Sequence, residues 1–263
     1  EARLVSAVTG TGNLQELPLG LEFRLAPGWK IYWRTPGEAG VPPRLELQLA
    51  SGHAVTNDIQ WPVPKRFDAF GFDNFGYDNT VILPITLRGH PKGAAVQIIG
   101  EMEALACADI CVPFSGKIGL SLADGPATAS PHAIEIARYR AKVPRSSGAS
   151  PIQVESIWQD GNKLQVKFGA NSPVIDDIFV EGAPGIAFKK PIYNNGLASI
   201  SLEGNLDVPL AGQVLDLTIV ADQMFVTSRH TVAKNSLSNK VTGLAPENRN
   251  LWTIVAFAFL GGL

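Results

Sequence analysis

Cysteine is scarce in this chain of 263 residues: there are two, and they lie close together at Cys107 and Cys111. Charged residues make up only 17% of the chain, without a lysine or arginine run, and the net charge is -2. A nucleic-acid partner is therefore not indicated, since such proteins carry a basic patch or stripe. The histidines are scattered, and none has ligand spacing to the cysteines, so we predict no metal site and no small cofactor.

Hydrophobic residues are plentiful at 45%, which provides for a core and excludes a disordered chain. The 26 glycines and 19 prolines fit many turns between short strands. Residues 1–125 read as such strands; Arg44–Leu49, for example, alternates polar and apolar residues. Residues 151–235 form a second strand-rich block, in which Gln159–Asn162 is a good hairpin turn. We predict an all-β protein of two β-sandwich domains.

The segment 126–150 differs from both blocks and is predicted to be a helix followed by a linker. Ser130 is a suitable N-cap for the helix. Three apolar residues share one helical face: Ile134, Ala137 and Ala141. Arg145–Ser150 has the composition of a flexible linker, and we place the domain boundary there.

The last part of the chain, residues 236–263, is predicted to be a polar connector and the start of a truncated transmembrane helix. Asn250–Leu263 is an uncharged run that contains a tryptophan, but it is shorter than the roughly 20 residues of a membrane span. The alternative is a buried C-terminal strand or helix.

The cysteines are separated by Ala108-Asp109-Ile110, which is not the two-residue gap of a thioredoxin motif. Strand-like sequence on both sides predicts a tight hairpin, whose opposed Cα atoms lie about 4.5–5.5 Å apart and allow a disulfide. So short a loop constrains little of the unfolded chain, which favours an exchanging pair over a structural one. The alternatives are a passive hairpin disulfide, two reduced buried thiols, or a thiolate pair that binds copper(I).

Five aromatic residues lie in the eleven residues Phe67–Tyr77, interleaved with glycine and aspartate. They do not fit the alternation of a strand, and we interpret the segment as a mobile loop whose Phe70 or Phe72 covers the cysteines. The alternative is ordinary core packing. Asp68 and Asp109 are expected to raise the pKa of a nearby thiol and to slow unwanted reactions.

Three stretches resemble the N-terminal periplasmic region of the ScsB/DsbD family of membrane thiol-disulfide reductases, and the ScsB branch (suppressor of copper sensitivity protein B) most of all. The longest is GWKIYWRTPGEAGVPP at residues 28–43. The second is LACADICVPF at residues 105–114, and the third is the apolar AFAFLGGL at residues 256–263. The shorter cysteine spacing and Gly71 depart from DsbD and fit ScsB better.

The resemblance implies two immunoglobulin-like sandwiches in the periplasmic region of an inner-membrane protein. It implies a protein-disulfide reductase with Cys107 and Cys111 as the catalytic pair, Cys111 facing the partner, and Phe70 in a cap. The pair would take electrons from the protein's own or an associated membrane domain and reduce periplasmic thioredoxin-fold proteins, either disulfide isomerase-like or peroxide-linked. The alternative from another class is a non-catalytic sandwich that binds a protein partner or copper and carries a structural disulfide.

Overall fold

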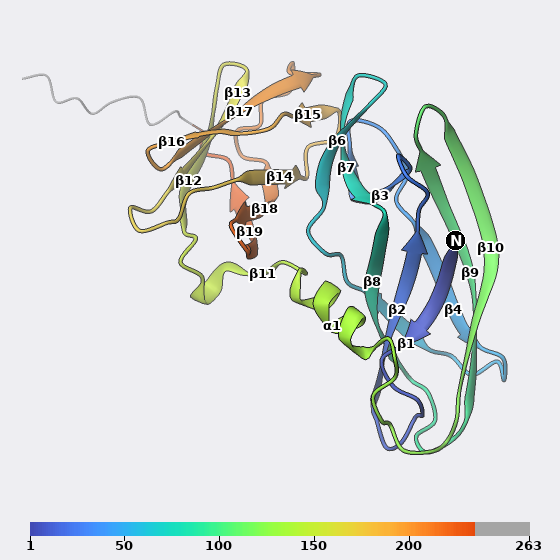
Figure 1. The fold of residues 1–263 in the computed structure, drawn as a ribbon. Coiled ribbons are helices and arrows are strands. Elements are labelled where there is room, and N and C mark those ends of the chain that lie inside the picture. The colour runs from blue at the N-terminus through green and yellow to red at the C-terminus, as the bar shows by residue number, and fades with distance from the viewer. Residues whose placement is uncertain (235–263) are drawn as a thin grey trace, which may run out of the picture.

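The computed structural model describes residues 1–234 and is almost entirely β, with one α-helix in this range (Figure 1). The predicted all-β fold is therefore confirmed. Within residues 1–234, no helix has the length and apolar character needed to cross a membrane. The connector and membrane-helix start predicted at 236–263 lie outside the described residues.

The first sandwich consists of two sheets of antiparallel strands. One sheet has the order β1 (Ala2–Ser6), β2 (Glu16–Arg24), β8 (Thr80–Arg88) and β5 (Thr56–Ile59). The other has the order β10 (Cys111–Leu122), β9 (Val96–Cys107), β3 (Lys30–Gly37), β7 (Phe72–Asp78) and β6 (Lys65–Ala69), while β4 (Arg44–Leu49) also pairs with β9. The side chains between the sheets follow the period of two expected of strands, as in β2, where Leu17, Leu19, Leu21 and Phe23 are fully buried.

The helix α1 (Ala133–Ala141) lies against β8 and covers a different face than predicted. Ile136 is buried at 2% exposure, whereas Ile134 is 69% exposed. The reason is a long-range one: Ile136 packs in a buried cluster with Val5 and Ile82 of the first sandwich. This cluster lies above Gly20 of β2, whose missing side chain leaves room for it. The N-cap residue is His132 and not the predicted Ser130; the hydroxyl of Ser130 instead accepts a hydrogen bond from the backbone N–H of His132, two residues later.

The second sandwich also has two sheets. The first has the order β11 (Arg145–Ser146), β19 (Met224–Thr231), β18 (Val214–Ala221) and β14 (Asp177–Glu181). The second has the order β12 (Val154–Asp160), β13 (Lys163–Phe168), β17 (Leu197–Gly204) and β15 (Ile186–Phe188), with β16 (Ile192–Asn194) also paired to β17. The predicted turn at Gln159–Asn162 is present, because Asp160 pairs with Lys163.

The predicted flexible linker is largely ordered structure. Arg145–Ser146 pairs in parallel with Val226 and Thr227 of β19, and a 3-10 turn, η1 (Ser147–Ala149), follows. The composition of the segment is that of a linker, but its backbone completes the edge of the second sandwich.

Each sandwich has its own hydrophobic core; from the second sandwich, Phe179 belongs to the first core and the partly buried Val220 packs against it. Phe179 on β14 is 1% exposed and packs edge-on against Phe75, with ring centroids 5.0 Å apart. It also packs against Trp33 at 5.9 Å. The two sandwiches therefore share an apolar contact, and they lie side by side in Figure 1. The division into domains at 1–125, 126–150 and 151–235 stays a prediction.

Replacing Phe179 by alanine is expected to lower the free energy of unfolding by about 3–5 kcal/mol, because a buried aromatic ring is lost and a cavity remains. Val174→Ala is the control, since Val174 is 70% exposed, and its effect should stay within about 0.5 kcal/mol. Denaturant unfolding measures both. Equal stability of the two variants would contradict the role of Phe179 at this contact.

Candidate active site

The cysteines lie at the tip of the β9–β10 hairpin, as the sequence predicts. Cys107 and Cys111 face each other across the strands and are joined by a disulfide, with Cα atoms 4.1 Å apart. The intervening three residues form the turn, which is closed by a hydrogen bond from the N–H of Ala108 to the carbonyl of Ile110. The predicted disulfide-bonded hairpin is confirmed.

The two sulfur-bearing residues differ sharply in exposure. Ala104 and Ala106 of β9 point into the core between the sheets, so Cys107 lies on the opposite, outer face. Cys107 is nevertheless only 1% exposed, whereas Cys111 is exposed. Since an attacking thiolate needs a line of approach to the sulfur, Cys111 is the accessible member of the pair.

The hydroxyl of Tyr32 on β3 donates a hydrogen bond to the Sγ of Cys107, over 3.1 Å. Tyr32 is 2% exposed, and burial raises the pKa of its hydroxyl, so the group stays protonated and remains a donor. Sequence reasoning missed this residue. It belongs to the family-like stretch at residues 28–43, but no spacing rule connects it to Cys107, 75 positions away.

Three neighbouring segments hold the ring of Tyr32. Gly40 has a positive φ of 120°, and a Cβ there would collide with the ring, so the backbone of the loop lies directly on it. Phe67 of β6 packs against the same ring, with centroids 5.7 Å apart. The backbone of Tyr32 pairs with Gly76 of β7. These contacts explain how Cys107 is buried although it lies outside the main core.

The segment Phe67–Tyr77 is not the mobile loop that the sequence suggested. It belongs to a regular β6–β7 hairpin, in which Ala69 pairs with Phe72 across the two-residue turn Phe70-Gly71. Both turn residues have positive φ values, 59° and 81°. The type I′ hairpin turn requires this at both positions, and glycine meets the requirement without strain. A bulky residue such as Phe70 rarely adopts it.

Phe70 and Phe72 are 59% and 45% exposed. In Figure 1 the turns of the β6–β7 and β9–β10 hairpins both lie at the upper end of the first sandwich. The aromatic contact that leads to the cysteines runs through Phe67 and Tyr32, neither of which we predicted as a site residue. The cap role of Phe70 and Phe72 stays a prediction.

The two acidic residues predicted to tune the thiols are both exposed. Asp68 accepts a weak hydrogen bond of 3.4 Å from the N–H of Gly71 in the hairpin turn, and Asp109 lies in the turn between the cysteines. Their effect on the thiols stays a prediction.

Exposed apolar side chains surround Cys111, among them Ile110 at 62% and Val112 at 39%. Beside them lies a groove of about 560 Å³ between β4 and the β9–β10 hairpin. Its apolar lining includes Val41, Pro113 and Phe114. Within residues 1–234, no cluster of three or more His, Cys, Asp or Glu side chains is placed to hold a metal ion. The site therefore combines an accessible sulfur, a shielded sulfur with a hydrogen-bond donor, and an apolar rim.

One family model and several solved structures are similar to this chain. Residues 5–122 match the family described as thiol:disulfide interchange protein DsbD, N-terminal. The N-terminal periplasmic domain of ScsB from Proteus mirabilis superimposes with a TM-score of 0.68 at 23% identity, over 88% of this chain and 92% of that one. The reduced N-terminal domain of DsbD from Neisseria meningitidis gives a TM-score of 0.29 at 10% identity, over 49% and 86%. A comparison with curated proteins finds no match.

Replacing Tyr32 by phenylalanine is expected to slow the reduction of the disulfide by dithiothreitol. When the reagent attacks Cys111, the sulfur of Cys107 leaves, and in the variant this sulfur no longer receives the hydrogen bond of the Tyr32 hydroxyl. A hydrogen bond worth about 1 kcal/mol corresponds to a rate about fivefold slower. Tyr77→Phe is the matched control, because the Tyr77 hydroxyl is also buried but donates to the carbonyl of Pro62, 2.7 Å away. An unchanged rate in Tyr32→Phe would contradict the role of this bond.

Proposed function

We propose that the chain is a periplasmic module that relays electrons by thiol-disulfide exchange, a proposal supported by the match of residues 5–122 to the DsbD N-terminal family. It accepts two electrons from a membrane dithiol domain and reduces periplasmic thioredoxin-fold proteins. The observation that carries the proposal is the asymmetric disulfide, in which Cys111 is exposed and Cys107 is buried against the hydroxyl of Tyr32.

In the first half-reaction the donor's thiolate attacks the Sγ of Cys111. A new S–S bond joins the donor to Cys111, and the Cys107–Cys111 bond breaks. The bonding electron pair passes to the sulfur of Cys107, where the Tyr32 hydroxyl stabilises the developing charge. A leaving thiolate that is stabilised in this way departs faster. The donor's second thiolate then attacks the donor's own sulfur, releases Cys111 as a thiolate and leaves the donor oxidised.

In the second half-reaction the thiolate of Cys111 attacks a disulfide of the target protein, and one target sulfur leaves as a thiolate. Cys107 then attacks the sulfur of Cys111 in the mixed disulfide. The Cys107–Cys111 bond forms again, and the second target sulfur leaves. The target has gained two electrons and two protons, and the module has returned to its disulfide form. The module thus acts as a protein-disulfide reductase without a small cofactor.

The same family resemblance supports a periplasmic location, next to a membrane domain of the same or an associated protein. Persisting disulfides are usual in that oxidising compartment. Disulfide isomerase-like or peroxide-linked proteins of the thioredoxin fold are the targets that we propose. The exposed apolar residues around Cys111 suit a protein partner better than a small polar substrate.

We include in the proposal a cap formed by Phe70 and Phe72. Phe70 is held in a left-handed conformation at the hairpin tip with its ring largely exposed, and such outliers often mark functional positions. An aromatic ring covers much area with few rotatable bonds. The cap would move as a hairpin with β6 and β7, rather than as a loose loop. Asp68 and Asp109 would add negative charge near the thiols and slow non-specific reactions.

The relay is tested by trapping mixed disulfides with the variants Cys107→Ser and Cys111→Ser. Cys107→Ser leaves the exposed nucleophile without its resolving partner, so mixed disulfides with oxidised periplasmic proteins should accumulate and be identified by mass spectrometry. Cys111→Ser leaves only a buried thiol, so the amount of mixed disulfide it traps should be at least about tenfold lower than with Cys107→Ser. Thioredoxin-fold proteins among the captured species support the proposal. Stronger trapping by Cys111→Ser would reverse the assigned roles, and no captured disulfide protein would refute the relay.

The cap is tested by alkylating the reduced protein with iodoacetamide. Phe70→Ala and Phe72→Ala should be labelled faster than the wild type, because the ring is lost while the Cβ keeps the backbone as it was. Ile192→Ala, at a 73% exposed position of the second sandwich, is the control. Equal labelling rates in all four proteins, at equal thermal stability, would rule out the cap.

A further inference from the structure

We propose that the second sandwich, β11 to β19, positions the redox pair by clamping the segments that hold Tyr32 against Cys107. The inference rests on the proposed function, because it assigns a part in the exchange reaction to residues remote from both sulfurs. Asp177, Glu181 and Lys189 are the positioning residues.

The clamp, which consists of Asp177, Glu181 and Lys189, binds residues in each of the segments that surround Tyr32. On β3, the two residues that follow Trp33 reach Glu181 of the second sandwich: Arg34 forms an ion pair with it at 2.7 Å, and the hydroxyl of Thr35 donates to it. On the loop that carries Gly40, Glu38 forms an ion pair with Lys189.

On β6, the residue before Phe67 is Arg66, and its Nε–H donates a bifurcated hydrogen bond to both carboxylate oxygens of Asp177, at 2.8 and 2.9 Å. Arg66 also donates to the backbone carbonyls of Ile178 and Phe188 and forms an ion pair with Asp73 on its own hairpin. The second sandwich thus contacts all three segments close to Tyr32. Arg34 lies two residues from Tyr32, Glu38 lies two residues from Gly40, and Arg66 is next to Phe67.

The ion pair of Arg66 with Asp177 is sheltered from solvent, and those of Glu181 and Lys189 are partly so. The side chain of Arg66 is 10% exposed and that of Asp177 is 15% exposed. The guanidinium also lies over the rings of Phe75 and Phe179, at 4.7 and 5.1 Å from their centroids. Sheltered, charge-assisted hydrogen bonds with fixed geometry restrict their partners far more than exposed surface pairs do. Arg66 and Phe179 therefore join the two sandwiches into one unit at this point.

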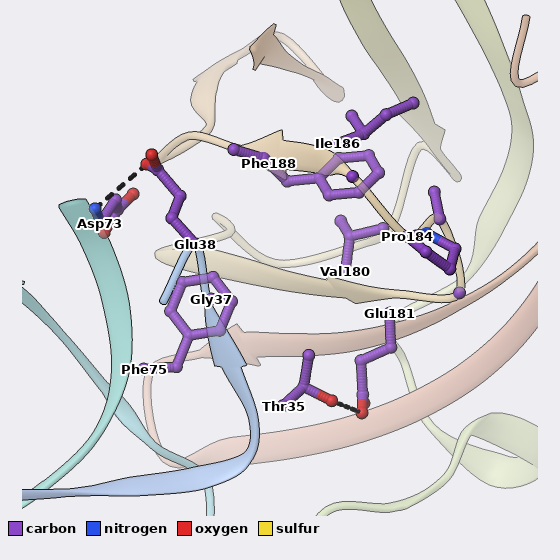
Figure 2. A pocket seen from close by; sticks show the side chains of 14 residues that line it. Thr35, Gly37, Glu38, Asp73, Phe75, Val180, Glu181, Pro184, Ile186 and Phe188 are labelled. Atoms are coloured by element: carbon purple, nitrogen blue, oxygen red, sulfur yellow. Dashed lines mark hydrogen bonds between the residues drawn. The ribbon is translucent and has the colours of Figure 1, made fainter. Parts of the chain in front are cut away.

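A cavity of about 240 Å³ lies between the sandwiches beside these contacts, and Figure 2 shows its lining. Thr35 and Phe75 reach it from the first sandwich, and Val180, Glu181 and Phe188 from the second. The figure shows the hydrogen bonds of Thr35 with Glu181 and of Glu38 with the N–H of Asp73. Because the cavity interrupts apolar packing here, the polar contacts at its edges add to the apolar contact of Phe179 with Phe75 and Trp33.

The consequence concerns the balance between the disulfide and the dithiol. A thiolate accepts a stronger hydrogen bond than a disulfide sulfur does, so a well-placed Tyr32 favours the reduced state. If the clamp loosens, Tyr32 moves more freely and this preference falls. A substitution that only lowers overall stability affects the oxidised and reduced native states alike and leaves the balance unchanged.

The test measures the equilibrium constant for reduction of the Cys107–Cys111 disulfide by glutathione, between pH 7 and 9, in the whole chain. Asp177→Asn and Lys189→Met should each lower it by about threefold or more, the loss expected for a weakened hydrogen bond to a charged sulfur. Glu155→Gln is the control, because Glu155 pairs with Lys167 within the second sandwich, with both side chains exposed. Circular dichroism verifies that each variant is folded, and either positioning variant suffices if the other does not fold.

The same substitutions in a Tyr32→Phe background make the test specific. If the clamp acts through Tyr32, the equilibrium constant of each double variant equals that of Tyr32→Phe alone. Three results would overturn the proposal. One is a wild-type equilibrium constant in folded Asp177→Asn and Lys189→Met, and another is an equal change of this constant in Glu155→Gln. The third is a further change in the double variants that is as large as in the single variants. The measurement needs no protein partner, so its failure is distinct from a failure to trap thioredoxin-fold proteins.

Discussion

The hydrogen bond from Tyr32 to Cys107 is the contact on which the rest of the site depends. Cys107 lies on the outer face of a sheet, where the main core does not bury it and other segments have to cover it. The core between the sheets takes Ala104 and Ala106 and leaves Cys107 on the other side. The loop at Gly40, the ring of Phe67 and Tyr32 itself lie on that side. Shielding one sulfur while exposing the other thus requires three segments to meet around a single phenol ring.

This requirement accounts for the density of specific residues in the stretch 28–43. Strand residues alternate between faces, so Ile31 and Trp33 enter the core while Tyr32 reaches the cysteine. Arg34 and the residues after it turn to the second sandwich, and Gly40 returns to lie on the Tyr32 ring. One segment therefore serves the core, the redox pair and the interface between the sandwiches.

The sequence predicts the local features of this protein well. The cysteine hairpin, most strands and the helix follow from alternation, turn residues and spacing, all of which act over a few positions. The features it does not reveal depend on distant partners. The buried face of the helix is set by packing against Val5 and Ile82, which lie far away in the sequence, and the strand at Arg145–Ser146 forms because it can pair with the edge of β19. Tyr32 and the ion pairs of Arg66 likewise become visible only when the chain has folded.

The aromatic segment shows why a pattern can mislead. Five aromatic residues spaced by glycine and aspartate lack strand alternation, yet the backbone of β6 and β7 forms a regular ladder from Lys65 to Gly76. The turn at Phe70-Gly71 has the φ values of a hairpin turn, although Phe70 is a poor residue for them. Pairing with β3 imposes the strand, and Arg66 fastens it to the second sandwich. Local preference was overridden by tertiary contacts.

The size of the disulfide loop completes the physical account of a reversible pair. The strands β9 and β10 are each 12 residues long and pair along their whole length, so the hairpin does not need a covalent link at its tip to keep its register. A closed loop with three intervening residues removes little entropy from the unfolded chain. Opening and closing the bond therefore changes the stability of the fold only slightly, while the ladder keeps both sulfurs within reach of each other. The pair can change its redox state without the sandwich having to refold.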